Sequence, residues 1–162
     1  MPVNRLLVEL IDEGFLDQGL GARQVGRFIV YEPMKKNRFL VRFPNQFGGI
    51  ESFCVSSTER PSWERLNGWC DVTIRLVDLV SHSTTKRLWD FIRWQEKETN
   101  RETALLFVIE SLEPTGLVIE RWEIFGLVIR IEFEELAYDS DDVSSTKVTI
   151  APIDINLIVS DQ

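Results

Sequence analysis

Few residues in the sequence have the type and spacing that catalysis requires. A serine or cysteine nucleophile normally needs a histidine base held by a carboxylate, and His82 is the single histidine of the chain. It stands in SHSTT, before a predicted helix, where capping residues gather by default. The chain has no P-loop, HExxH or CxxC motif. We therefore expect a protein that is not an enzyme.

Acidic residues are abundant but are not spaced as metal ligands or as an acid–base pair. Glu134–Glu135 and Asp141–Asp142 are sequence neighbours near a predicted turn, which favours a solvated surface. The cluster that begins at Asp139 lacks the central glycine of a calcium loop. Ile150 stands where the glutamate at position twelve of that loop would be. No metal site is expected.

Cysteine and glycine spacing also predict no cofactor. The separation of Cys54 and Cys70 matches no zinc motif. Two buried free thiols in strands are the favoured interpretation, and a disulfide formed late inside an assembled particle is the alternative. In the segment GLGARQVG, Gln24 stands where a dinucleotide fingerprint needs its third glycine. No strand is predicted before that segment, so we expect a flexible connection there.

The charge distribution argues against a surface that grips nucleic acid. The chain of 162 residues has a net charge of −8, and residues 110–142 hold ten acids against two arginines. Residues 1–43 carry a net charge of +2. Binding to phosphates needs a concentration of lysine and arginine, which is missing. An acid-rich surface that only maintains solubility is the simple alternative.

Length and hydropathy fit a single domain with a core of its own. Hydrophobic residues make up 44% of the chain, yet none of the apolar runs approaches the roughly 20 residues that span a bilayer. Acids interrupt the N-terminal segment where a signal peptide needs an apolar stretch. We expect a protein that stays in the cytosol or in a particle assembled there.

Strand patterns dominate after residue 26, and a short amphipathic helix is predicted over residues 4–17. Strands are predicted over residues 27–32, 37–43, 50–57, 69–80, 103–112, 117–126, 127–133 and 146–159. Residues 33–36 and 113–116 are predicted turns, and residues 58–68 a loop. The runs over 103–112 and 117–126 are predicted to form a hairpin.

Alternation assigns faces to these strands. One face is shared by Cys70, Val72, Ile74 and Leu76, and another by Leu127, Ile129, Ile131 and Phe133. In the last run the alternation changes parity after Pro152, which predicts a bulge or an edge position.

One helix is predicted within residues 81–100. Leu88, Phe91, Ile92 and Gln95 follow helical spacing and mark the core face, flanked by Trp89 and Trp94. An aromatic stripe at this spacing is usually core and not a ligand platform. The predicted fold is mainly β: a rolled antiparallel sheet or β-barrel with one packed α-helix.

Four segments, in order, resemble the tail tube protein family of contractile-tailed bacteriophages, which is related to type VI secretion tubes. NRFLVRFP resembles the opening strand of that family. WCDVTIRLVDLVSHSTTKRLWDFIRWQ resembles its strand, polar turn and helix, which ends here in Phe91, Ile92, Trp94 and Gln95. WEIFG and ELAYDSDDVSSTKVTIAPID resemble its later strands. The resemblance covers residues 37–158, which implies a β-barrel domain over 37–162 after an N-terminal helix and extended segment over 1–36.

The resemblance implies a structural virion protein without a cofactor. Family members join their sheets into hexameric rings that form one barrel across subunits, and the rings stack into a conduit for the genome. The implied partners are further copies of the chain, the tail sheath, baseplate and tail terminator proteins, and DNA in transient passage, with no direct membrane binding. The implied location is the virion tail, with assembly in the host cytoplasm.

A negative bore is typical of the family, because like charge keeps DNA from adhering. Acids on alternating strand positions and at the last turn are therefore predicted to face the lumen: Glu120, Glu123, Glu132, Glu134, Asp139, Asp141 and Asp142.

Two departures from the family pattern bear on this interpretation. The segment before residue 37 is longer than the family predicts, and Val128–Ile129 replaces a more polar segment. A baseplate tube-initiator protein, or the tube of another contractile injection system, is the closest alternative. A small barrel that binds a ligand or single-stranded nucleic acid is a second alternative, and it would need a basic groove lined with aromatic residues.

Overall fold

The computed structural model describes residues 32–48, 53–97 and 104–160. The chain divides into two units, Met1–Asn37 and Arg38–Gln162, and the strands and the α-helix described here belong to the second. The predicted helix over 4–17, the glycine-rich segment and nearly all of the strand over 27–32 lie outside the described residues.

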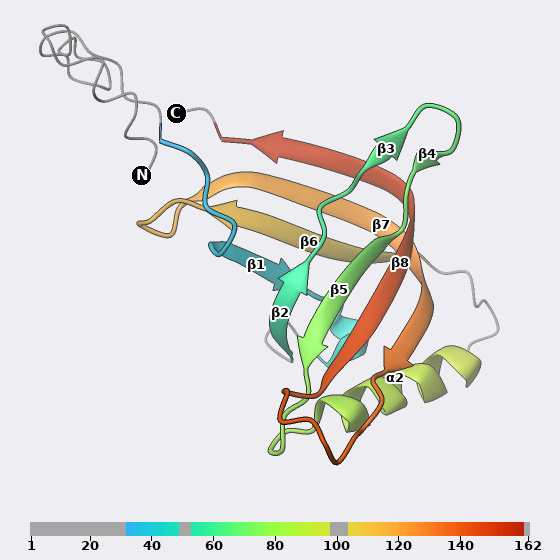
Figure 1. Ribbon diagram of the computed structural model, residues 1–162. Coiled ribbons are helices and arrows are strands. Elements are labelled where there is room, and N and C mark those ends of the chain that lie inside the picture. The colour runs from blue at the N-terminus through green and yellow to red at the C-terminus, as the bar shows by residue number, and fades with distance from the viewer. Residues whose placement is uncertain (1–31, 49–52, 98–103, 161–162) are drawn as a thin grey trace, which may run out of the picture. The chain divides into compact units, whose positions relative to one another are not determined.

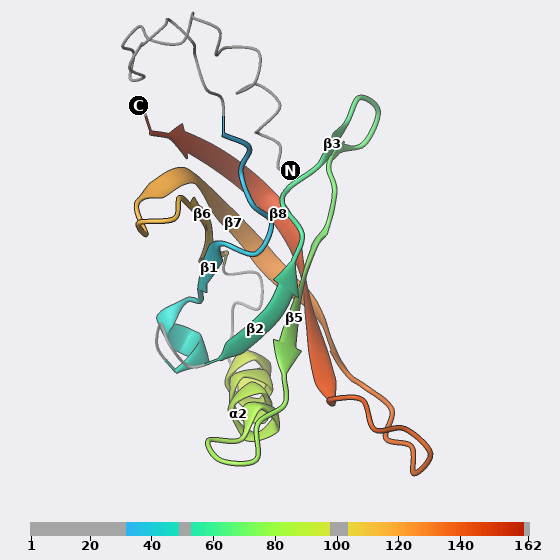
Figure 2. The same cartoon turned by 60° about the vertical axis from the view of Figure 1, so that its left-hand side comes forward.

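Six strands form one antiparallel sheet that curls into a nearly closed barrel (Figure 1, Figure 2). In spatial order the strands are β1 (Phe39–Arg42), β6 (Leu105–Leu112), β7 (Val118–Phe133), β8 (Ser145–Val159), β5 (Val72–Val77) and β2 (Cys54–Thr58). The predicted rolled antiparallel sheet is confirmed. The predicted hairpin of residues 103–112 and 117–126 is also confirmed as β6 and β7.

Residues 58–68 were predicted to be a loop, and this prediction is wrong. Strands β3 (Trp63–Glu64) and β4 (Gly68–Trp69) pair there as a separate two-stranded hairpin. The left-handed backbone of Gly68, with φ of 75°, closes the turn, and glycine adopts such a conformation at little cost. Strands of two residues are too short to give an alternation pattern.

The single α-helix of the described residues, α2 (Thr84–Lys97), follows β5 and lies at the end of the sheet where β5 ends (Figure 1). Ser83 Oγ accepts a hydrogen bond from the Lys86 amide and so acts as the helix cap. The buried Thr84 hydroxyl donates to the Val77 carbonyl over 2.8 Å. Strand and helix are therefore joined by a short, hydrogen-bonded connection.

The core is an aromatic cluster between the helix and the concave face of the sheet. Phe47, from a 3-10 helix (η1, Asn45–Phe47), stacks on Phe91 with ring centroids 4.0 Å apart. Phe43 and Phe107 pack around this pair. The rest of the core comes from alternate positions of the strands, including Val72, Ile74, Leu76, Ile124, Val148 and Ile150. The predicted face of β5 is confirmed at Val72, Ile74 and Leu76.

Strand β7 is continuous through two runs that were predicted separately. Val128 and Arg130 pair with the consecutive residues Ile150 and Thr149, so Ile129 is the extra residue of a bulge. Ile129 is 53% exposed, whereas Ile131 packs against the core. The predicted common face of Ile129 and Ile131 is therefore wrong, because one inserted residue reverses the alternation.

The change of parity in β8 has the predicted cause. Gly126 pairs with Pro152 and Phe125 with Asp154, which leaves Ile153 as the extra residue of a second bulge. Ile150 before the bulge and Ile155 after it both face the core. The prediction of two buried thiols is wrong, because Cys54 is exposed and Cys70 is only half-buried; both are free. Edge strand β2 places Cys54 at the surface.

Candidate assembly surfaces

The seven predicted lumen acids do not lie on one face of the sheet. Glu120 and Glu123 are three residues apart on β7 with no bulge between them, so they point to opposite faces. Glu120 lies on the same face as Trp122, which packs against the core. Trp122 Nε1 donates a hydrogen bond to Glu120 Oε1 over 3.0 Å. Glu123 and Glu132 lie on the face turned away from the core.

The remaining predicted lumen acids belong to the connection between β7 and β8, residues 134–144. Glu134 stands at its beginning, and Asp139, Asp141 and Asp142 are exposed along it. These four are therefore placed at one end of the sheet and not along its length. The sequence analysis grouped these four acids with the acids on the strands, because alternation alone does not show where a strand ends.

The sheet face turned away from the core carries a chain of polar contacts across four strands. Glu110 of β6 lies between Arg42 of β1 and Arg121 of β7, at 3.3 and 3.1 Å. Arg121 also contacts Glu123 at 3.2 Å, and Asn156 of β8 donates to that glutamate. The Glu110 side chain is only 3% exposed. Two arginines thus compensate a buried carboxylate, which would otherwise be costly.

Sequence reasoning missed Glu110 as part of such a cluster. A signal was present: it is the one charged residue in the apolar run TALLFVIESL. Its partners come from two other strands, and pairing them requires the strand register.

Over β5, β8 and the second half of β7 the same face carries three cations, Arg75, Lys147 and Arg130, near Glu132. Arg75 lies opposite Lys147, and Lys147 lies opposite Glu132. Arg130 contacts Glu132 at 3.5 Å. Each predicted lumen acid on this face therefore has a cation beside it.

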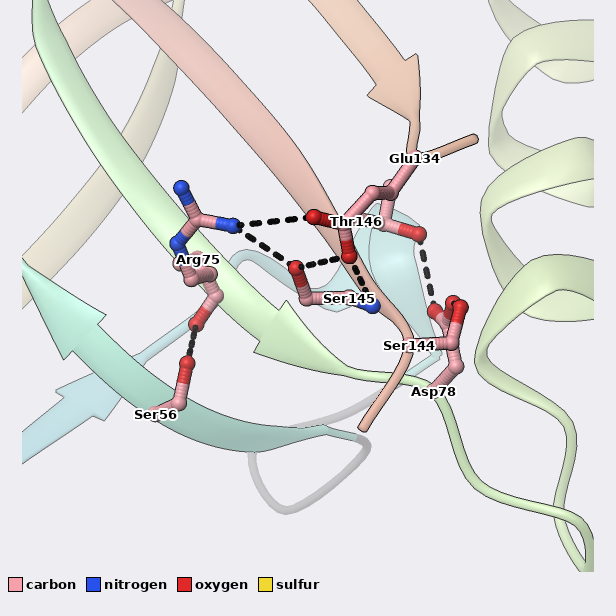
Figure 3. A network of polar contacts seen from close by, with 7 residues as sticks. All are labelled: Ser56, Arg75, Asp78, Glu134, Ser144, Ser145 and Thr146. Carbon is pink, nitrogen blue, oxygen red and sulfur yellow. Dashed lines mark hydrogen bonds and ion pairs between the residues drawn. The ribbon is translucent and has the colours of Figure 1, made fainter. Parts of the chain in front are cut away.

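A polar network fixes the base of the β7–β8 connection (Figure 3). Glu134 Oε1 accepts hydrogen bonds from both the amide and the hydroxyl of Ser145, each over 3.0 Å. Arg75 Nη1 donates to the same hydroxyl over 2.7 Å. Asp78, just after β5, accepts from Ser144 and Thr146. The connection therefore leaves the sheet from a fixed point.

The hairpin β3–β4 is also fixed at its base. Arg60 forms an ion pair with Glu120 at 2.7 Å. Trp69 meets Trp122 edge to face, with centroids 6.5 Å apart. Glu59 Oε1 accepts from the Thr73 amide over 2.9 Å. Three contacts thus hold the hairpin against the start of β5 and the first half of β7.

Both outer strands of the sheet keep one hydrogen-bonding edge unpaired among the described residues. β1 pairs with β6 alone and β2 pairs with β5 alone. The sequence of β2, CVSST, has none of the lysine or proline residues that commonly protect an edge. Each edge is a template for a further strand.

The predicted helix residues differ in burial. Leu88 and Phe91 are buried in the core, whereas Ile92 is half-buried. Ile92, Ile129 and Ile131 line a shallow groove between α2 and β7 of about 200 Å³.

Nothing among the described residues assembles into a chemical centre. His82 is exposed in the turn before α2. No group of three or more histidine, cysteine or acidic side chains in the described ranges is placed to hold a metal ion. None of the helices there is long and apolar enough to cross a membrane.

Comparison with known proteins gives fold relatives only. None of the protein-family models matches the sequence, and neither do any of the curated proteins. A chain from the anti-feeding prophage (AFP) baseplate matches with a TM-score of 0.57 and 17% identity, over 80% of this chain and 98% of its own. A chain from the AFP tube-terminating cap matches with a TM-score of 0.56 and 11% identity, over 81% and 94%. A chain from the sheath–tube complex of PVC, an extracellular contractile injection system, matches with a TM-score of 0.56 and 14% identity, over 79% and 93%.

Proposed function

We propose that the chain is the tail tube subunit of a contractile-tailed bacteriophage. Hexameric rings of this subunit would stack into the conduit through which the genome leaves the particle. The observation that carries the proposal is the curled sheet whose two outer strands each keep one edge unpaired within the part of the chain that the structure describes. The fold likeness to chains from contractile injection systems, which extends over nearly their full length, supports it.

Ring formation follows from the physics of the two edges. A strand edge with free amides and carbonyls readily pairs with another chain. β1 and β2 are at opposite ends of the strand order, so one edge of each copy can meet the other edge of its neighbour. Such a contact is heterologous, and it closes into a ring when the rotation between copies divides a full turn. Closure then leaves no edge open.

The partners and location follow from this role. A tube subunit contacts further copies of itself, the tail sheath protein, and the baseplate and tail terminator proteins at the two ends. DNA passes through without specific binding. The protein acts in the virion tail after assembly in the host cytoplasm, and it acts without catalysis, cofactor or metal.

The bore is best assigned to the sheet face turned away from the core. The opposite face is occupied by α2 and the aromatic cluster, which leaves this face for the lumen. Of the predicted lumen acids, Glu123 and Glu132 lie on it, and each is within ion-pair distance of an arginine. Such pairing would keep these two arginines from phosphates, so that fewer cations on the wall are free to bind DNA.

A baseplate tube-initiator protein is the second candidate. The likeness to a chain of the AFP baseplate favours it, because the TM-scores of the baseplate and sheath–tube chains are almost equal. The tube of another contractile injection system is the third. An initiator would form one or two rings and stop, whereas a tube subunit would continue to polymerise.

Electron microscopy of the purified full-length chain over a concentration series tests the proposal. We expect rings at moderate concentration and hollow tubes at high concentration. Rings that never exceed one or two layers would support the initiator, and a fixed dimer without rings at any concentration would contradict both.

A further inference from the structure

Two protrusions leave the sheet at opposite ends. The hairpin β3–β4 precedes β5 at Val72, and the β7–β8 connection begins β8 at Ser145, which pairs with Val77 at the other end of β5. Figure 1 and Figure 2 both place the hairpin beyond one end of the sheet and the connection beyond the other. If neighbours join laterally through β1 and β2, these two ends face along the axis of the ring.

The tip of the hairpin exposes apolar side chains, and its two charges are Arg65 and Glu64, whose carboxylate accepts a hydrogen bond from Asn67. Leu66 lies in the turn and is 93% exposed. Arg65 beside it is exposed and has no ion pair among the described residues. Trp63 is also largely exposed. Because the base is fixed to β7 through Arg60 and Trp69, the tip is held away from the sheet.

The connection at the other end is apolar and acidic. Residues 134–144 surround an open hollow of about 640 Å³. Leu136, Tyr138 and Val143 line it and are each largely exposed to solvent. Glu134, Glu135 and Asp142 also line it, and Asp139 and Asp141 belong to the same connection. No lysine or arginine occurs between Arg130 and Lys147. The hollow is large enough to receive a leucine side chain.

We propose that the hairpin tip of one copy inserts into this hollow on a copy in the next ring. Leu66 would contact Leu136, Tyr138 and Val143, while Arg65 would meet the acids at the rim. The contact removes exposed apolar surface from both protrusions and brings opposite charges together. It is heterologous and does not close, so it extends into a filament. This inference rests on the proposed stacking of rings and identifies its axial contact.

The charges favour this pairing over contacts between like protrusions. Two β7–β8 connections placed against each other would oppose acids with acids. Two hairpin tips would offer Arg65 only Glu64, which already accepts a hydrogen bond from Asn67. Juxtaposed like charges disfavour an interface. The head-to-tail arrangement places Arg65 beside several acids and covers apolar groups of both protrusions.

Disulfide cross-linking between two tagged forms of the chain tests the contact directly. Both forms carry Cys54→Ser and Cys70→Ser, which removes the native thiols. One form adds Asn67→Cys beside the tip, and the other adds Ser140→Cys on the wall of the hollow. Oxidation of the mixture should join one chain of each tag. Each form oxidised alone should remain uncoupled, because the contact is not two-fold.

Two further variants separate the roles of shape and charge. In the tip form, Leu66→Ser should abolish cross-linking. Arg65→Glu should lower the cross-linking yield about fivefold, the size that a surface ion pair supports. Asp141→Lys with Asp142→Lys in the partner form should restore the yield against Arg65→Glu.

Microscopy of the same samples distinguishes failure of this inference from failure of the proposed function. Tubes without cross-linking between positions 67 and 140, or equal cross-linking within one form, would overturn the contact and leave the tube assignment standing. Absence of both rings and cross-links would overturn both. Rings that form but do not stack in the Leu66→Ser variant would support both the axial contact and the tube assignment.

Discussion

Gly126 of β7 lies so close to Ala151 of β8 that a Cβ atom at Gly126 would be 2.6 Å from the Ala151 carbonyl oxygen. The obstacle is backbone, which cannot move aside like the end of a side chain. The close approach lies where the bulge at Ile153 changes the register between the two longest strands. Glycine is therefore required at this position by contact and not by its backbone angles.

Gly126→Ala should lower the free energy of unfolding by about 1–3 kcal/mol, the usual cost of overpacking a core position. Thermal or denaturant unfolding measures it. Gly116→Ala is the comparison, since a Cβ there meets open space and only its φ of 95° opposes the change. A smaller loss at Gly126 than at Gly116 would show that β8 can move away.

Phe91→Ala should lower the free energy of unfolding by about 3–5 kcal/mol, because the ring is buried and stacked on Phe47. Ile92→Ala should cost less, since Ile92 is only half-buried. Trp89→Ala is the control on the exposed side of α2. Equal melting temperatures for Phe91→Ala and Trp89→Ala would contradict the packing of this helix.

Removal of the buried carboxylate by Glu110→Gln should leave Arg42 and Arg121 partly uncompensated. We expect a loss of about 3 kcal/mol, at the low end of the range for buried pairs, because both arginines still reach solvent. A double-mutant cycle with Arg121→Gln isolates the pair. The matched control is the exposed pair Arg130–Glu132, for which a cycle should give about 0.2–1 kcal/mol. Equal coupling energies in the two cycles would show that burial of Glu110 does not strengthen its ion pair.

The sheet could be predicted from the sequence wherever strands alternate without interruption. In β5, Val72, Ile74 and Leu76 follow one period, and all three are buried. The prediction failed at Ile129, because a single bulge residue reverses the faces that follow it. It failed at Trp63–Trp69, because each strand of that hairpin has only two residues.

The candidate surfaces were harder to predict than the fold. The acids of residues 134–144 were recognised from composition, but their position at a strand end depends on where β7 stops. Glu110 gave a local signal as a charge in an apolar run, yet its partners are 68 residues before it and 11 after it. Contacts of this kind depend on register, which sequence periodicity does not determine.

The last prediction concerns the charge of the proposed bore and tests it at Glu123 and Glu132. Both lie on the sheet face turned away from the core, beside Arg121 and Arg130 respectively. Replacing both by lysine would leave these arginines without their acids and add two cations. Counterion release would then favour binding of phosphates along the wall.

Particles assembled with Glu123→Lys and Glu132→Lys should therefore eject DNA more slowly than native particles, and the delay should shrink as salt rises, because salt weakens phosphate contacts. Electron microscopy first establishes that the tubes are complete. The matched control is Asp90→Lys with Glu96→Lys, which makes the same change of charge on α2, on the other side of the sheet. Ejection at the native rate from intact lysine particles would place this face outside the bore. A delay in the control alone would assign the lumen to the helix side.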